Sequence, residues 1–263
     1  MTHRSRLAMD DQDLLTRFRY FLKDSVRLTI DFSRTDQSLG VPPPPIQKPC
    51  PAGTPRISLP RPGAWKRIPA IDLLTAIERR RSRRHYLPVP LSLDELSFLL
   101  WITQGVQKRL DTGTALRTVP SAGCRHAFET YLIALNVDGL RPAIYRYLPM
   151  DHQLVLVREQ EALATHAVSA AHGQGFVGSA AVTFAWAVIP YRMEWRYHIA
   201  AHRVILMDAG HVCQNLYLGC EAIGAGCCAI GAFHQEAMDD LLAVDGEEEF
   251  TCYLASVGKV SSP

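Results

Sequence analysis

Apolar residues recur at helical spacing in several segments of the chain. The segment SLDELSFLLWITQGV (92–106) opens with Ser92, a typical helix cap, and Glu95 follows three residues later, which is the capping-box pattern. Shorter amphipathic patterns predict further helices in three segments. These are DLLTRFRYFLKDSVRL (13–28), IDLLTAIERR (71–80) and QEAMDDLLAV (235–244).

Other segments are rich in β-branched and aromatic residues and are bounded by turn residues, which is typical of strands. FETYLIALNV (128–137), AIYRYL (143–148) and QLVLV (153–157) are split by Asp138-Gly139 and by residues 149–152, which predicts a meander. AAVTFAWAVI (180–189) is apolar on both faces and predicts a central strand. EEEFTCYLASVGKV (247–260) predicts a last strand, and the mixture of helices and hairpins predicts the α+β class.

The longest helical pattern runs from Arg192 to Ile223. Its seam recurs at alternating steps of four and three, and at 1.5 Å per residue the helix would be about 45 Å long. Such a helix either forms the spine of a large core or packs against a second copy of the chain. Val212 and Ala222, off the seam, indicate cover on more than one side. The seam residues are Trp195, Ile199, His202, Leu206, Ala209, Cys213, Leu216 and Cys220.

Two parts of the chain differ in composition. Residues 31–62 are rich in Ser, Gly and Pro and include VPPPPIQKPCPAGTPRISLPRPG, which cannot support a helix or a central strand. We therefore expect residues 1–67 to form an N-terminal helix and a proline-rich arm, and residues 68–263 to form the main domain.

Charge and composition exclude some classes of protein. The chain has 28 Lys and Arg against 26 Asp and Glu. Its net charge of +2 gives no overall electrostatic field that would bind nucleic acid. We find no signal peptide and no apolar run of membrane-spanning length, so we predict a cytoplasmic protein with no membrane partner. The seven cysteines show no CxxC pair, and we expect reduced, mostly buried thiols.

Three motifs suggest chemistry that we set aside. IGAGCCAIG (223–231) fits G-x-G-x-x-A, but a dinucleotide site needs a strand to enter the turn, and here a helix enters; we interpret Gly224 as the helix C-cap, followed by a strand or tight loop. Glu194, His198 and His202 stand at steps of four, yet nothing completes a metal shell, so we predict no metal. Cys124 near His126 is not a hydrolase signature.

The segment ERRRSRRHY (78–86) concentrates arginines in a nearly neutral chain. Cations at the end of a helix complement its dipole, which would be a purely structural role. A basic patch for RNA or DNA is another alternative. The third interpretation is that Arg80, Arg81, Ser82 and Arg84 follow the helix into a turn, where guanidinium groups and a hydroxyl converge on one phosphate.

Several motifs in order, from Ile68 to Val260, resemble the nitroreductase superfamily of FMN enzymes, in particular the SagB-type (thiazole/oxazole) dehydrogenase branch. They are ERRRSRRHY, PLSLDELSFLLW, TVPSAGCRHAFETYL, YRYLPMDHQLV, IPYRMEWRY, LMDAGHVCQNLYLGCEAIGAG and YLASVGKV. The resemblance implies an α+β homodimer with an antiparallel-rich central sheet flanked by helices. It also implies a long central helix at the dimer interface and two FMN molecules there.

The resemblance also implies roles for single residues. Arg80, Arg81 and Ser82 would hold the FMN phosphate and ribityl chain, and Arg84 would approach the pyrimidine edge, where a cation stabilises reduced flavin. Pro120, Ser121 and Ala122 would come from the second subunit. Ala229, Ile230 and Gly231 would lie along one flavin face, with a backbone N–H near N5. Lys259 would complete phosphate binding.

The branch transfers a hydride to flavin N5 and oxidises azolines in modified peptides, while a base removes a ring proton. The family's Lys-Tyr pair for this step corresponds to Arg196-Tyr197. Guanidinium is a poor base, so Tyr197 is the candidate acid or base and Arg196 a positioning group. Ala127 also departs from the branch, which has proline there. We therefore predict an FMN-dependent oxidoreductase of SagB type. The alternative is an NAD(P)H-dependent reductase of nitroaromatics, quinones or similar small acceptors.

Overall fold

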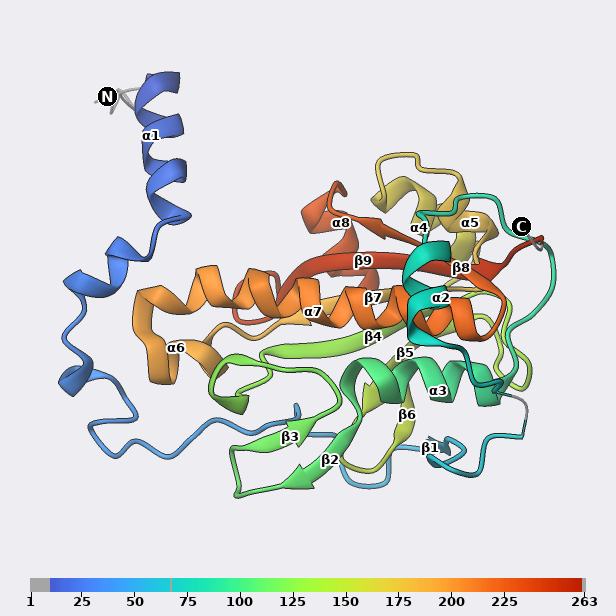
Figure 1. Cartoon of the computed structure of the whole chain (residues 1–263), viewed down its shortest axis with the longest axis horizontal. Coiled ribbons are helices and arrows are strands. Elements are labelled where there is room, and N and C mark those ends of the chain that lie inside the picture. The colour runs from blue at the N-terminus through green and yellow to red at the C-terminus, as the bar shows by residue number, and fades with distance from the viewer. Residues whose placement is uncertain (1–9, 67, 262–263) are drawn as a thin grey trace.

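Seven strands form one sheet through the middle of the molecule (Figure 1). The computed structural model describes residues 10–66 and 68–261. Neighbouring strands pair antiparallel in the order β1-β6-β5-β4-β7-β9-β8, which confirms the antiparallel-rich sheet and the α+β class. The strands are β1 (Arg56–Ser58), β4 (Phe128–Ala134), β5 (Ala143–Leu148), β6 (Gln153–Arg158), β7 (Val182–Val188), β8 (Ala225–Ile230) and β9 (Phe250–Lys259). A separate hairpin joins β2 (Val106–Arg109) to β3 (Ala115–Arg117).

The central part of the sheet follows the sequence prediction. β4 pairs with β5 and β5 with β6, so the meander is confirmed. Gly139 has a φ of +80° in the first connection, a conformation that glycine adopts without steric cost. β7 lies between β4 and β9 and is buried along its whole length, which confirms the predicted central strand.

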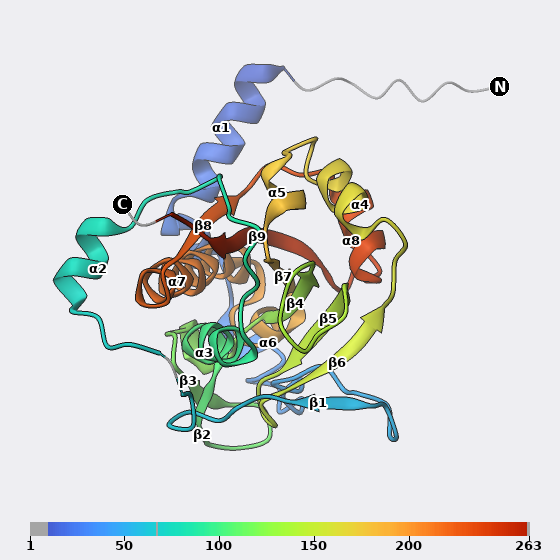
Figure 2. The same ribbon diagram turned by 90° about the vertical axis from the view of Figure 1, so that its right-hand side faces the viewer.

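Helices cover both faces of this sheet (Figure 2). α3 (Leu93–Gln104) and α7 (Ala201–Ala222) contribute to the hydrophobic core on one face, and α2 (Leu73–Arg79) lies outside α7. α4 (Leu163–Ala170), α5 (Phe176–Ser179) and α8 (Gln235–Leu242) cover the other face. α3 begins at the predicted capping box, in which Ser92 accepts from the Glu95 backbone N–H and the Glu95 side chain accepts from that of Ser92.

The predicted long helix is present but interrupted. α6 (Tyr191–Tyr197) and a 3-10 turn, η4 (His198–Ala200), precede α7. His198 has φ +50° and ψ −139°, a backbone conformation outside the helical region, so the axis bends there. The seam is not buried throughout: Trp195 and the positions from Ala209 onward are buried, whereas Ile199 and Leu206 between them are exposed. Val212 and Ala222 are buried, which confirms cover on more than one side.

The N-terminal segment begins with a helix that stands away from the body. α1 (Asp11–Phe21) has no buried residue, and both views show it projecting (Figures 1 and 2). Two 3-10 turns, η1 (Asp24–Thr29) and η2 (Phe32–Arg34), lead from it toward the body. The guanidinium of Arg203 on α7 lies 2.8 Å from the Asp24 carboxylate in η1, so an ion pair joins this segment to the start of α7.

The proline-rich arm lies on the body as an extended chain. Its prolines have no N–H and keep the arm from forming regular hydrogen-bonded structure. Its carbonyl oxygens therefore need donors from elsewhere. Two arginines of the body, Arg117 and Arg146, supply them and are nearly fully buried in doing so. The acceptors are the main-chain oxygens of Ile46, Lys48 and Pro49, at 2.6–3.0 Å. β1, also in the arm, extends the sheet by pairing with β6.

The cysteines and the end of α7 test two further expectations. All seven cysteines are free, and those at 213, 220, 227 and 228 are buried. α7 ends with Ile223 as its C-cap, so the predicted cap at Gly224 is one residue too late; Gly224 follows with a φ of +60°, and β8 begins directly after it. Within residues 10–66 and 68–261, no helix is both long enough and apolar enough to cross a membrane.

Candidate active site

The arginine run leaves α2 and follows an edge of the sheet. α2 ends at its C-cap, Arg80, and the chain then becomes extended. The Arg83 backbone N–H donates to the Cys227 carbonyl of β8 at 2.9 Å, and Ser82 forms a parallel bridge with Cys227. Because β8 holds the backbone in this way, the side chains of the run have a fixed location beside the strand.

The run encloses a hollow of about 430 Å³. Its lining residues are Arg81, Ser82, Arg83, Arg84, His85, Val260 and Ser261. Arg81, Ser82 and Arg84 are exposed, and the Arg84 guanidinium lies 5.8 Å from the ring of Phe176 on α5. The hollow therefore offers guanidinium groups and a hydroxyl to a ligand, which is the donor set that suits an anion.

Tyr217 connects this run to the end of β8. Its hydroxyl lies 2.9 Å from Ser82 Oγ and accepts from the Ala229 backbone N–H, also at 2.9 Å. The Arg80 guanidinium lies 5.3 Å from the centre of the Tyr217 ring. The structure thus brings Arg80, Ser82 and Ala229 together, with Ile230 buried and Gly231 exposed just beyond.

Sequence reasoning did not single out Tyr217. The available signal was a tyrosine in the otherwise apolar stretch LYLG of α7, beside the seam. That signal is weak because a tyrosine near a core is common, and its hydroxyl partners lie in two remote segments.

Lys259 has other partners than the arginine run. Its ammonium donates to the Glu95 carboxylate at 2.5 Å and to the Ile223 carbonyl at 2.6 Å. These contacts join the end of β9 to the start of α3 and the end of α7. Lys259 does not line the hollow, so its role in phosphate binding stays a prediction.

A second group of predicted residues gathers around a turn before β4. Ser121 and Ala122 lie at η3 (Ala122–Cys124), and Pro120 is exposed just before it. The Ala122 backbone N–H lies 3.4 Å from Asp208 Oδ1 of α7. Burial raises the pKa of Asp208, although the Ser121 hydroxyl and the Ala122 N–H act in the opposite sense.

Arg196 and Tyr197 lie against the same turn. A methyl group built on Gly123 would lie 2.6 Å from the Tyr197 hydroxyl oxygen and 3.1 Å from Arg196 Nε. The Arg196 guanidinium is 5.5 Å from the Tyr197 ring. The structure therefore brings the predicted segment 120–122 together with the predicted pair Arg196-Tyr197.

The two groups are distinct within one chain. Asp208 and Tyr217 mark their positions on α7, and at 1.5 Å per residue these are about 14 Å apart along the helix. Residues 80–84 and 229–231 lie near Tyr217, whereas residues 120–122 and Arg196-Tyr197 lie near Asp208.

Two of the histidines set aside earlier, His202 and His126, have structural partners. His202 Nε2 lies 2.7 Å from the Glu194 carboxylate across the bend at His198. No group of three or more His, Cys, Asp or Glu side chains in the described part of the chain could hold a metal ion. His126 is buried with its Nε2 2.9 Å from the Ala115 carbonyl, and burial lowers its pKa to about 3.

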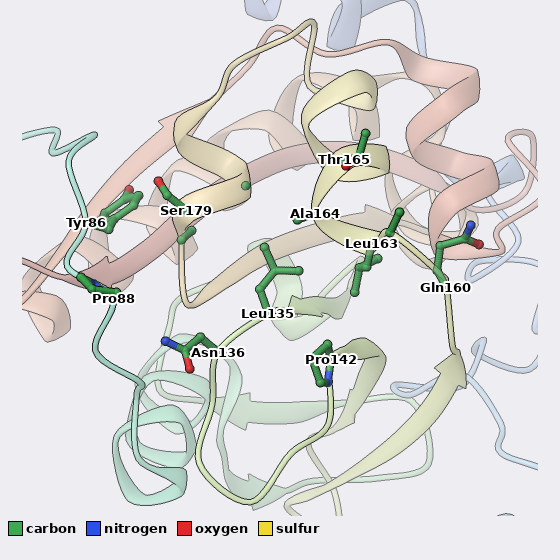
Figure 3. Close-up of a pocket in the computed structure, with 13 residues that line it drawn as sticks. Tyr86, Pro88, Leu135, Asn136, Pro142, Gln160, Leu163, Ala164, Thr165 and Ser179 are labelled. Carbon is green, nitrogen blue, oxygen red and sulfur yellow. The ribbon is translucent and has the colours of Figure 1, made fainter.

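A larger cavity of about 540 Å³ lies elsewhere, between the loop after β4, the start of α4 and the end of α5 (Figure 3). Figure 3 shows Tyr86 and Ser179 on one side of it, with Leu163 and Gln160 on the other. The Tyr86 hydroxyl donates to the Arg83 carbonyl at 2.8 Å. No predicted site residue lines this cavity, so we do not include it in the candidate site.

A model of the nitroreductase family matches residues 77–259, which include both groups of residues. The chain belongs to the nitroreductase family. Members of this family are oxidoreductases that typically bind flavin and form dimers. The match includes the arginine run at one end and Lys259 at the other.

Two relatives are similar in sequence. Protein MJ1384 of Methanocaldococcus jannaschii, named as a nitroreductase, is 31% identical over 192 residues, which cover 73% of this chain and 93% of MJ1384. The trifolitoxin-processing protein TfxB of Rhizobium leguminosarum bv. trifolii is 26% identical over 198 residues, which cover 68% of this chain. That match covers 52% of TfxB, so this chain spans about half of its length.

Two solved structures are similar in fold. A nitroreductase from Ralstonia eutropha JMP134 has a TM-score of 0.65 at 26% identity, covering 84% of this chain and 95% of that one. A chain of the E. coli microcin synthetase McbBCD complex, solved with truncated pro-MccB17 bound, has a TM-score of 0.58 at 18% identity. It covers 96% of this chain and 95% of that one, and at this identity the likeness shows the fold alone.

Proposed function

We propose that this nitroreductase-family chain is an FMN-dependent oxidoreductase of the SagB type. The observation that carries the proposal is the arginine run held along β8, with Arg81, Ser82 and Arg84 facing one hollow. Guanidinium groups bind phosphate oxygens in a bidentate fashion, and a serine hydroxyl adds a further donor. The donor set therefore fits a phosphorylated cofactor.

The residues fit FMN in particular because the end of β8 lies beside these donors, where the flavin ring can lie. In this proposal Arg80, Arg81 and Ser82 hold the phosphate and the ribityl chain, and Arg84 lies at the pyrimidine edge. Segment 229–231 lies along the ring. Bound FMN supplies the hydride acceptor and donor, while the protein binds, orients and shields it.

The second group of residues supports a homodimer. Segment 120–122 and the pair Arg196-Tyr197 are distant from residues 80–84 in the same chain, so a second copy would bring them to the flavin. Several apolar side chains are exposed on α2 and on α7 with the turn before it, as a contact between copies would require. They are Leu73, Leu74, Ile77, Ile199, Leu206 and Met207.

We infer that the substrate is a modified peptide whose azoline rings are oxidised. The name of TfxB and the bound pro-MccB17 of the microcin synthetase connect two similar proteins with peptide processing. In this chain Tyr197 would move the ring proton, and Arg196 would hold the substrate by its charge. The alternative substrate is a nitroaromatic, quinone or related small acceptor reduced with NAD(P)H, as the name of the family suggests.

The experiment measures FMN binding to the purified chain by quenching of flavin fluorescence. We expect wild-type protein to bind FMN, and Arg81→Ala and Arg84→Ala each to weaken binding about tenfold or more, since each removes a charge-assisted hydrogen bond. Arg109→Ala, which removes an exposed arginine on β2, is the matched control and should leave binding unchanged.

Two results would contradict the proposal. One is wild-type protein that binds no FMN, and the other is equal affinity in the variants of the arginine run and the control. The FMN-loaded protein is then assayed with a thiazoline peptide and, separately, with NADPH and a nitroaromatic. Thiazole formation supports the peptide substrate, whereas reduction of the nitroaromatic alone supports the alternative.

A further inference from the structure

We propose that Tyr217 is a positioning residue that makes Ser82 a hydrogen-bond donor toward the bound cofactor. This inference rests on the proposed function, because it concerns the ligand of the arginine run. It assigns a role to a buried side chain of α7 that lies behind that run.

The directions of the two hydrogen bonds at Tyr217 follow from donor and acceptor chemistry. The Ala229 backbone N–H can only donate, so at 2.9 Å the Tyr217 oxygen accepts from it. The Tyr217 hydrogen then needs an acceptor of its own. Ser82 Oγ, also at 2.9 Å, is the acceptor that the structure provides among the described residues.

This arrangement leaves the hydrogen of Ser82 free to point elsewhere. A serine hydroxyl whose oxygen accepts one bond still has its own O–H to donate. Ser82 is exposed and lines the hollow, whereas Tyr217 is only 9% exposed. The Ser82 hydroxyl therefore faces the ligand as a donor, which suits the phosphate or ribityl oxygens of FMN.

Burial and one further contact keep the tyrosine in this role. Burial raises the pKa of Tyr217, so its hydroxyl remains protonated over the working pH range. The Arg80 guanidinium lies 5.3 Å from the ring centre, within the range of a cation–π contact. Tyr217 thus fixes Arg80, Ser82 and the end of β8 relative to one another.

The test compares the affinities of four full-length proteins for FMN and for riboflavin. They are the wild type, Ser82→Ala, Tyr217→Phe and the double variant. We expect Ser82→Ala to weaken FMN binding about tenfold and Tyr217→Phe to weaken it several-fold. The double variant should bind FMN about as tightly as the Ser82→Ala protein. If Ser82 contacts the phosphate, riboflavin binding should be unchanged in these variants. If it contacts the ribityl chain, riboflavin binding should fall equally.

Tyr145→Phe is the matched control, since it removes a buried tyrosine hydroxyl that donates to the Arg141 carbonyl at 3.0 Å, away from the site. It should leave FMN affinity unchanged. Wild-type affinity in Tyr217→Phe, or losses that add in the double variant, would overturn the inference. FMN binding by the wild-type protein would in that case still support the proposed function. A wild type without FMN affinity would overturn both.

If Tyr217→Phe does not fold, 3-fluorotyrosine at position 217 provides the second test. Fluorine makes the hydroxyl a stronger donor and leaves the ring in place. FMN should then bind more tightly, and Ser82→Ala should abolish that gain. Unchanged affinity in the fluorinated protein would overturn the inference.

Discussion

Asp208 is a carboxylic acid in a place that does not favour its charge. It is 4% exposed, and its Oδ2 is buried without a hydrogen-bond partner in the described structure. Its Oδ1 accepts from the Ala122 backbone, and the neighbouring His211 acts on its pKa in the direction opposite to burial. Burial is the largest cause of its raised pKa.

This raised pKa predicts how stability depends on pH. Below the ordinary aspartate pKa the group is protonated in both states and has no effect. Above it the unfolded chain ionises while the buried group keeps its proton, so the folded state loses stability until the pH has passed the raised folded-state pKa. Asp208→Asn should therefore gain stability relative to the wild type as the pH rises from the ordinary aspartate pKa to the raised folded-state pKa. Urea unfolding at several pH values measures this difference, and Asp151→Asn, at an exposed carboxylate, should show no such trend.

At the residue scale, the exposed members of the candidate site were easier to propose from the sequence than the buried ones. The arginine run is visible as a charge cluster in a nearly neutral chain. Tyr217 and Asp208 were not predicted, because their roles depend on Ser82, Ala229 and Ala122, which approach them only in the folded chain.

Among the elements, the turn at residues 120–126 has the most demanding backbone. Gly123, Cys124 and His126 have φ values of +58°, +55° and +47°. Such values cost a non-glycine residue about 1 kcal/mol or more each, and neighbouring structure has to hold them. Arg125 and His126 are buried here, and Arg125 donates to the Arg192 carbonyl at 3.0 Å.

We expect Gly123→Ala to disturb both the backbone and the pair Arg196-Tyr197. The added methyl group would lie 2.6 Å from the Tyr197 hydroxyl, in addition to the strain of a positive φ. Gly139→Ala is the matched control, since Gly139 has φ +80° and nothing within 4 Å of the added carbon. Gly139→Ala should cost about 1 kcal/mol and leave turnover unchanged, whereas Gly123→Ala should cost more and reduce turnover. Equal effects on stability and turnover in the two variants would contradict this prediction.

The elements themselves were mostly predictable from the sequence. The capping box fixed the start of α3, and turn residues separated β4, β5 and β6. The break at His198 was missed because the apolar spacing continues through it from Trp195 to Leu206. The bend depends on the backbone at one residue and on the Glu194–His202 contact, neither of which has a periodic signal.

At the scale of the whole molecule, a buried group of charges joins the arm, the sheet and α6. Glu129 accepts from Arg192 at 2.5 Å, from Arg146 at 3.1 Å and from the Lys48 backbone N–H at 2.7 Å. Burial alone would raise the pKa of Glu129, but the guanidinium groups of Arg192 and Arg146 and the Lys48 N–H outweigh it and lower the pKa. Its carboxylate therefore stabilises the fold above the ordinary glutamate pKa, and this contribution is lost as the pH falls through the lowered value.

Glu129→Gln should destabilise the protein by about 3–5 kcal/mol at neutral pH, because two buried guanidinium groups lose their counter-charge. Glu159→Gln removes a carboxylate that pairs with Arg141 on the surface, with both side chains more than half exposed, and should cost no more than about 1 kcal/mol. Urea unfolding monitored by circular dichroism compares the two. A loss in Glu129→Gln no larger than in the surface variant would show that the buried charges are not needed for stability.

The division of the chain at residue 67 remains a prediction, and the structure adds what composition could not indicate. Proline content excludes regular structure in most of the arm but says nothing about where an extended chain lies. Its location depends on Arg117 and Arg146, whose partners are main-chain atoms of a segment about 70 to 100 residues earlier.

Those arginines donate hydrogen bonds to main-chain oxygens, which every amino acid possesses. The arm can therefore exchange almost any of its side chains and keep these bonds, whereas one change in the body, at either guanidinium, would loosen it. Part of the information that fastens the arm is therefore encoded in the body, alongside the arm's own buried side chains such as Leu59.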